Sequence, residues 1–235
     1  MQTVASRRTF VRHMAIGLPV VVGAAGITHV GLEAEVSQHG MHMPPEPQVE
    51  SILRGLARIH NQLQRRPATA DDARAIGVQV RTLAAYRLQA NRDAVVVQAV
   101  RQGLDRMGRD AILDHQPDME AMRQELIAFG FDRPAVATTT GTRAERAAAL
   151  DRLIEGGVTP YFDSAWFLLQ NPEVFHLLAN DPNKCDVIRE MIRQMEVAAA
   201  LMCTIAVILP VAAAECFAAT SVLAALKTLE YFIGC

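Results

Sequence analysis

Apolar residues recur every three or four positions along most of the chain after residue 48, which is the spacing of amphipathic helices. The first such segment stops before Pro67. Its apolar positions are Val49, Ile52, Leu53, Leu56, Ile59 and Leu63. Similar patterns predict further helices over residues 69–89, 91–108, 109–115, 117–130, 142–157 and 160–170, and from Pro172 and Pro182 onward. We find no strand pattern of convincing length and no internal repeat.

Two threonines sit where helix starts are expected. Thr69 is followed three residues later by Asp72, and Thr142 is followed three residues later by Glu145. This spacing is typical of a capping box, in which the two side chains satisfy backbone N–H groups of the first turn. Residues 132–141 are rich in Thr and Ala, and we expect a loop or short extended piece there.

Other helix starts are indicated by a capping side chain alone or by a cap before proline. Asn91 can cap the helix that ends at Gly108. Asn171-Pro172 and Asp181-Pro182 each place proline at the first helical position after a capping residue. The second of these pairs is expected to begin a long helix.

The composition supports a helical fold. Apolar residues make up 51% of the 235 residues and aromatic residues only 5%, which favours helices over sheets. We predict an all-α fold, a multi-helix bundle with a hydrophobic C-terminal helical hairpin, in a single helical domain over residues 49–235. From residue 35 onward, 20 Lys and Arg (23 less three in the leader) face 24 Asp and Glu (25 less Glu33). No basic face stands out, so no nucleic-acid partner is expected.

The N-terminus carries an export motif. Ser6-Arg7-Arg8-Thr9-Phe10-Val11-Arg12 precedes a short apolar run over residues 14–26. Through Arg7, Arg8 and Phe10 this segment resembles a twin-arginine signal peptide. The resemblance covers residues 1–34 only, and it implies export of folded cargo by the twin-arginine translocase to the periplasm or outside the cell. An uncleaved leader would instead anchor the chain to the outer face of the inner membrane.

A linker rich in His, Met and Pro is expected over residues 35–48. It contains His39, Met41, His42 and Met43 within five positions. Thioether and imidazole groups suit Cu(I), so this cluster is a candidate copper site. The alternative is a linker without chemistry of its own.

All four cysteines lie in the last 51 residues. If the chain reverses near Pro210, the pair Cys203 and Cys216 and the pair Cys185 and Cys235 are both centred on that turn. The spacing therefore predicts nested disulfides, Cys203–Cys216 and Cys185–Cys235, that staple a helical hairpin over residues 182–235. Free buried thiols are the alternative. If the protein folds before export, its cysteines would have to be oxidised to disulfides after export.

The same hairpin is also a candidate membrane segment, so membrane association is an alternative for this protein. Residues 197–214 and 216–226 carry no charge. Eighteen residues is the lower limit for a span, and Pro210 interrupts the run. Glu196 and Glu215 flank it without a compensating base nearby in the sequence. A buried central hairpin explains the pattern at least as well as a subunit that associates with membranes through residues 197–226.

Few residues suggest catalysis. A base beside a carboxylate is possible at Asp114-His115 and Asp118, and a pocket near Tyr161 could be lined by Asp163, Ser164 and Trp166. His60 and His176 lie beside apolar positions and are expected to belong to the core or its boundary. No serine lies in a Gly-x-Ser-x-Gly turn and no phosphate-binding Gly-rich loop occurs. We therefore expect an exported protein that acts by binding or assembly, with a metal- or cofactor-dependent protein as the alternative.

Overall fold

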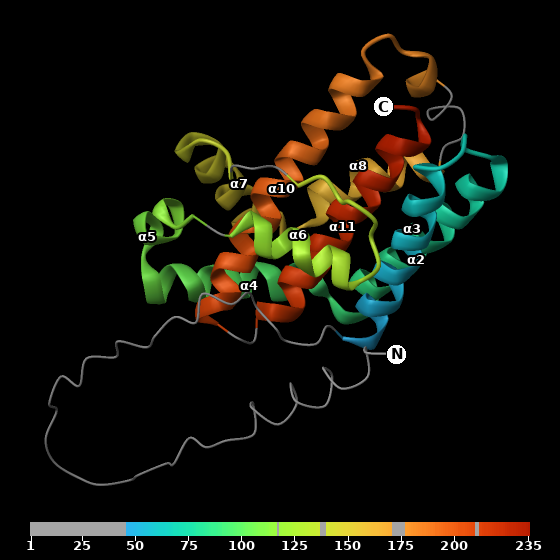
Figure 1. Cartoon of the computed structure of the whole chain (residues 1–235). Helices are drawn as coiled ribbons and strands as arrows, with labels where there is room; N and C mark the ends of the chain where they lie inside the picture. Colours follow the sequence, from blue (N-terminus) through green and yellow to red (C-terminus); the bar gives the residue numbers. More distant parts are fainter. Residues whose placement is uncertain (1–45, 117, 137–139, 171–176, 210–211) are drawn as a thin grey trace, which may run out of the picture. The chain divides into compact units, whose positions relative to one another are not determined.

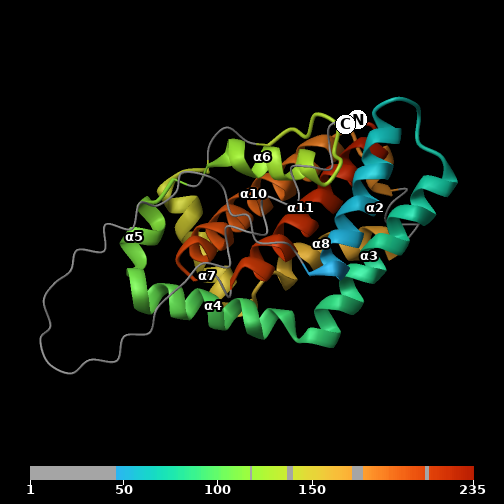
Figure 2. The ribbon, with the colours of Figure 1, turned by 60° about the horizontal axis from the view of Figure 1, so that its bottom comes forward.

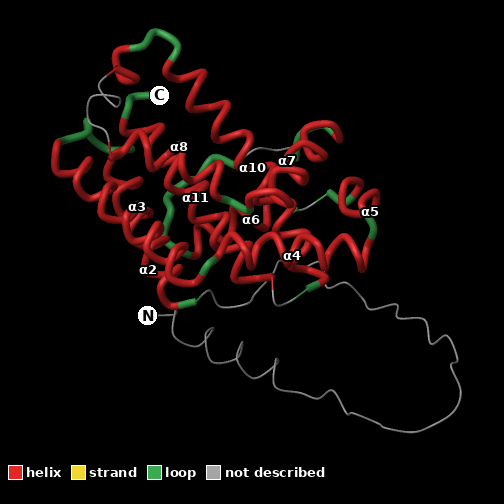
Figure 3. Tube along the Cα trace, turned by 180° about the vertical axis from the view of Figure 1, so that it is seen from behind, coloured by secondary structure: helices red, strands yellow, loops and turns green. Residues whose placement is uncertain are grey.

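The computed structural model describes residues 46–116, 118–136, 140–170, 177–209 and 212–235. Within these ranges the fold is all-α, and no strand occurs (Figure 3). The predicted fold class is therefore confirmed. The helices are α2 (Pro47–Leu63), α3 (Ala70–Ala90), α4 (Arg92–Met107), α5 (Arg109–Asp114), α6 (Met119–Ala128), α7 (Arg143–Gly156), α8 (Thr159–Gln170), α10 (Lys184–Ile208) and α11 (Ala213–Phe232) (Figure 1).

The core is built around α10 and α11. Except for Ala214, every residue of α11 from Ala213 to Leu229 is buried. A helix that is buried on all faces must be covered by other helices. Here α2, α3 and α8 pack on α11, while α7 and α4 pack on α10 (Figure 2).

Two disulfides join α10 to α11 and to the chain end beyond it. Cys203 is bonded to Cys216 and Cys185 to Cys235, with Cα atoms 4.7 Å and 5.4 Å apart. This is the nested pairing that the sequence spacing predicts. The bonds tie the end of α10 to the start of α11 and the start of α10 to the residues after α11, so the two helices run antiparallel. The reversal expected at Pro210 lies outside the described residues.

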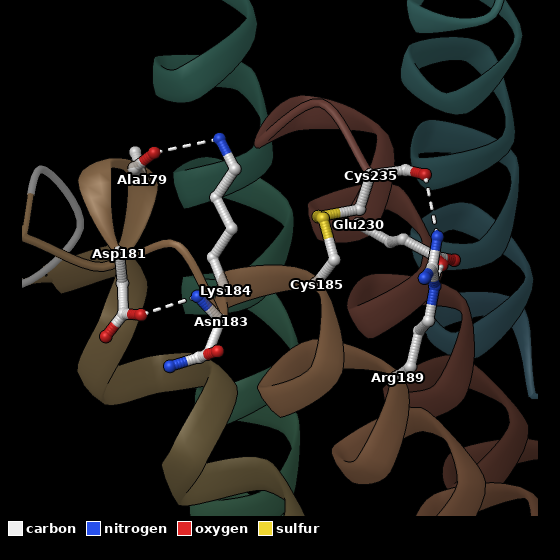
Figure 4. Close-up of a disulfide and its surroundings, with 8 residues drawn as sticks. All are labelled: Ala179, Asp181, Asn183, Lys184, Cys185, Arg189, Glu230 and Cys235. Atoms are coloured by element: carbon white, nitrogen blue, oxygen red, sulfur yellow. Dashed lines mark hydrogen bonds and ion pairs between the residues drawn. A yellow bond between two sulfur atoms is a disulfide. The ribbon is translucent and has the colours of Figure 1, made fainter.

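The outer disulfide lies at the end of the hairpin (Figure 4). Arg189 of α10 donates through Nη2 to the carbonyl oxygen of Cys235 at 3.3 Å, and its Nε lies 3.5 Å from Glu230 Oε1. Cys185 and Cys235 are half-buried, whereas Cys203 and Cys216 are 9% and 2% exposed. The inner bond is thus enclosed in the core and the outer bond is closer to solvent.

Both capping boxes form as predicted. Thr69 Oγ1 accepts from the backbone N–H of Asp72 at 3.3 Å, and Asp72 Oδ2 accepts from the backbone N–H of Thr69 at 2.8 Å. The reciprocal bonds between Thr142 and Glu145 are 3.2 Å and 2.7 Å long. These bonds fix the starts of α3 and α7 in the register that the sequence indicates.

Three predicted helix starts are wrong in detail. Asn91 does not cap α4 with its side chain; its φ of +46° forms the left-handed turn between α3 and α4, a conformation that asparagine tolerates. Asp181 does not cap α10 either. Its Oδ1 accepts from the backbone N–H of Asn183 at 2.7 Å, which closes a turn before the helix begins at Lys184. The first helix begins at Pro47, inside the segment expected to be a linker.

Candidate functional site

A cavity of about 440 Å³ lies beside the start of α2, where α3 meets α4. Its lining residues come from two separate parts of the sequence. They are Glu46, Pro47, Gln48, Tyr86, Gln89 and Arg92. This volume falls in the range of cavities that hold small molecules.

The left-handed turn at Asn91 brings the end of α3 and the start of α4 together at this cavity. Tyr86 lies in the last turns of α3, and Arg92 is the first residue of α4. The guanidinium carbon of Arg92 lies 4.4 Å from the centre of the Tyr86 ring. At this distance the cation is attracted to the face of the ring, which holds the guanidinium in place.

Two carboxylates that are far apart in the sequence, those of Glu46 and Glu215, bind the Arg92 guanidinium. Nη1 donates to Glu215 Oε1 at 2.9 Å, and Nη2 donates to both oxygens of Glu46 at 2.7 Å and 2.6 Å. The Tyr86 hydroxyl also donates to Glu46 Oε2, at 2.8 Å. The Glu46 carboxylate thus receives three hydrogen bonds from two side chains.

The two carboxylates differ in burial. Glu215 is 1% exposed, whereas 41% of the Glu46 side chain is exposed. Burial raises the pKa of Glu215 above its usual value, and the charge of Arg92 works against that rise. Glu215 Oε2 and Arg92 Nε are buried and have no hydrogen-bond partner in the part of the chain that the structure describes.

The protonation states at the cavity favour hydrogen-bond donation. Burial and the hydrogen bond to Glu46 raise the pKa of Tyr86, so its hydroxyl keeps its proton at neutral pH. An arginine guanidinium does not deprotonate in proteins. Both groups therefore act as fixed donors, and together they form a site that holds an anionic acceptor.

A second polar cluster lies inside the helical core. Lys227 of α11 pairs with Glu196 of α10 at 2.8 Å, and each side chain is 8% exposed. The sequence shows Glu196 and Glu215 beside an apolar run without a nearby base. In the structure the compensating bases are Lys227 and Arg92, and the latter is 123 positions from Glu215.

His60 of α2 belongs to the core, as its apolar neighbours predict. Its ring packs edge-on against Phe131 and Tyr231, with centroids 5.3 Å and 4.6 Å apart. Gln64 Nε2 lies 2.6 Å from His60 Nε2 and donates to the carbonyl oxygen of Asp132 at 2.8 Å. Burial, with the nearby charge of Lys227, lowers the pKa of His60 to about 4, so the ring is neutral at pH 7.

Among the described residues, the other sequence candidates near His115 have separate structural partners. Asp114 Oδ1 accepts from Arg143 Nε at 2.9 Å, and His115 is exposed. Asp118 caps α6 by accepting from the backbone N–H of Ala121. Each of these acids thus has a structural partner: Asp114 pairs with Arg143, and Asp118 holds the start of α6.

Two of the three residues expected to line a pocket near Tyr161 have hydrogen-bond partners. Asp163 pairs with Arg87 at 2.9 Å, and the Ser164 hydroxyl donates to the carbonyl oxygen of Pro160 at 3.3 Å. The Trp166 side chain lies outside the described part of the chain, as does His176.

The remaining candidates fall in residues 1–45, outside the described part of the chain. They are the export residues Arg7, Arg8 and Phe10 and the copper candidates His39, Met41, His42 and Met43. Among the residues that the structure does describe, no three His, Cys, Asp or Glu side chains are grouped to hold a metal ion.

Sequence reasoning missed the cavity because its parts lie far apart in the chain. Glu46 and Arg92 are 46 positions apart, and Glu215 is a further 123 positions away. The one available signal was Glu215, a carboxylate inside an apolar run that had no base near it. A buried acid of this kind requires a partner elsewhere in the fold.

Among the described residues, no helix has both the length and the apolar character that a membrane span requires. Comparisons with models of protein families, with curated proteins and with solved structures found no match for this chain.

Proposed function

We propose that this chain is an exported, disulfide-stapled helical protein that acts by binding, and that the cavity beside Arg92 is its binding site. The observation that carries the proposal is the convergence of Arg92 and Tyr86 on one cavity, where the buried Glu215 holds Arg92 and Tyr86 is itself buried. A few well-placed polar groups in a cavity of this size are typical of ligand sites.

Export is supported by two independent features. The twin-arginine motif at Arg7 and Arg8 provides the address, and two disulfides are typical of proteins from oxidising compartments. The test is to replace both arginines by lysine and follow the chain in fractionated cells. We expect the change to retain the chain in the cytoplasm. A variant exported as well as the wild type contradicts the proposed route.

Binding is favoured over catalysis by the chemistry of the two donors. General acid–base catalysis needs a group that gains and loses a proton near the working pH. Arg92 and Tyr86 keep their protons, so they hold and orient an acceptor. The nested disulfides also favour a binding role, because they fix the helical scaffold that positions the cavity.

The binding proposal is tested by filling the cavity. Gln89 lines it and is exposed, so Gln89→Trp adds bulk without removing any bond of Arg92. Gln98→Trp makes the same change at an exposed position of α4 that does not line the cavity. In a thermal-shift screen of small metabolites, we expect hits that Gln89→Trp abolishes and Gln98→Trp retains. Hits unaffected by Gln89→Trp, or no hits at all, contradict the proposal.

A further inference from the structure

We infer that the cavity beside Arg92 takes the carboxylate of an external ligand, and that Glu46 is an internal stand-in which this ligand displaces. The inference rests on the proposed binding function and specifies the chemical class of the ligand. It is carried by the three hydrogen bonds that Arg92 and Tyr86 already donate to one carboxylate.

The donors are held in place without help from Glu46. Glu215 binds Arg92 Nη1 from the buried side, and the ring of Tyr86 lies against the guanidinium. Tyr86 is itself 4% exposed, so its hydroxyl is aimed by packing. Removing the Glu46 carboxylate therefore leaves two oriented donors facing a cavity, which is a preorganised carboxylate site.

Glu46 is the group that can leave. It is the N-cap residue of α2, yet its side chain makes no capping hydrogen bond. The helix uses only its backbone carbonyl, which accepts from the N–H of Glu50 at 3.0 Å. The side chain is half-exposed, so water can replace the lost contacts. Its departure costs the helix no hydrogen bond.

Charge favours a carboxylate over other ligands. Once Glu46 has moved away, Arg92 faces the buried Glu215 on one side and an open cavity on the other. A carboxylate restores the single negative charge that Glu46 supplied. A phosphate group carries up to two negative charges at pH 7 and would place excess charge near Glu215. A ligand with an amine or guanidinium group would be disfavoured, because it offers no acceptor to the two donors and is repelled by the charge of Arg92. The exposed amides of Gln48 and Gln89 line the remaining space, where they can contact the rest of the ligand.

The test uses benzoate as the probe, with benzamide and benzylamine as neutral and cationic molecules of similar shape. Binding to the full-length, oxidised chain is measured by titration calorimetry for the wild type and for Glu46→Ala. A tethered carboxylate competes at a high effective concentration, so removing it is expected to tighten benzoate binding by about tenfold or more. Glu50→Ala is the matched control. It removes a carboxylate of the same helix that pairs with Arg54, and it is expected to leave benzoate binding unchanged.

A further variant checks that the gain arises at the donors. Tyr86→Phe in the Glu46→Ala background removes one donated hydrogen bond and is expected to weaken benzoate binding about fivefold. Benzoate that binds both proteins equally, or benzamide or benzylamine that binds as tightly as benzoate, overturns the carboxylate inference and leaves the binding function standing. If none of the three probes binds the Glu46→Ala chain, the carboxylate inference falls, while the binding proposal is decided separately by the screen with Gln89→Trp.

Discussion

Lys227 and Glu196 form an ion pair between the two central helices, with Nζ and Oε1 2.8 Å apart and each side chain 8% exposed. Charges removed from water to this extent are tolerated because each neutralises the other. The pair lies in the hairpin whose sequence is otherwise so apolar that it also suggested a membrane segment. Together with the two disulfides, the ion pair fixes the alignment of α10 against α11.

Breaking this ion pair on one side is expected to destabilise the protein strongly. Lys227→Met leaves Glu196 buried without its cation, and we expect a loss of about 3 kcal/mol in the free energy of unfolding. The double change Lys227→Met with Glu196→Leu removes both charges and is expected to recover most of that loss. Urea unfolding monitored by circular dichroism measures both. A double variant no more stable than the single one would show that the pair itself is stabilising.

His60 is expected to make the stability depend on pH in a defined window. Its pKa is about 4 in the folded chain against 6.5 for an ordinary histidine. Above pH 6.5 the ring is neutral in both the folded and the unfolded chain, so His60 does not lower the free energy of unfolding there. Below pH 6.5 the unfolded chain takes up a proton that the folded chain refuses, and stability falls until about pH 4, by on the order of 3 kcal/mol in total.

The contribution of His60 is isolated by subtraction. His60→Gln keeps an acceptor near Gln64 and does not titrate, so the difference in unfolding free energy between wild type and variant should change between pH 6.5 and 4 and be constant elsewhere. His115→Gln, at an exposed position, is the matched control. A difference curve that is flat across the whole window contradicts the burial of a neutral imidazole.

Gly157 is expected to be essential for the junction of α7, α8 and α4. Its φ is +61°, and a Cβ there would lie 2.9 Å from the Cα of Asp93, whose Oδ1 accepts from the backbone N–H of Thr159. Gly108 also has a positive φ, of +81°, but no atom within 4 Å of a built Cβ. Gly157→Ala is therefore expected to cost about 2 kcal/mol more than Gly108→Ala, because only the former adds a clash to the backbone strain. Equal midpoints of thermal unfolding for the two variants would contradict this packing.

The sequence predicted those features of the fold well in which the interacting residues are close together in the chain. The capping boxes at Thr69 and Thr142 form within four residues, and the apolar spacing of α2 directly specifies the face that it buries. The caps predicted at Asn91 and Asp181 are wrong because short polar side chains suit turns as well as helix caps, and only the surrounding backbone selects between these uses.

The cavity could not be predicted because it depends on contacts between distant parts of the chain. Tyr86 and Glu46 carry no motif, and they meet only because α2, α3 and α11 pack together. The disulfides were predictable for the opposite reason. A single fold-back determines the distance between all four cysteines, so symmetry about one turn was enough to select a pairing.

The most direct test of the stapled hairpin is tryptic mapping of the denatured, unreduced chain after its free thiols have been blocked. Trypsin releases residues 185–189, 194–227 and 228–235 as separate peptides that carry the cysteines. Nested bonds predict that 185–189 stays joined to 228–235, while 194–227 is free and lighter by two hydrogens than its reduced form. Either other pairing joins all three peptides into one species. That species, or blocked thiols on any of the three, would contradict the account.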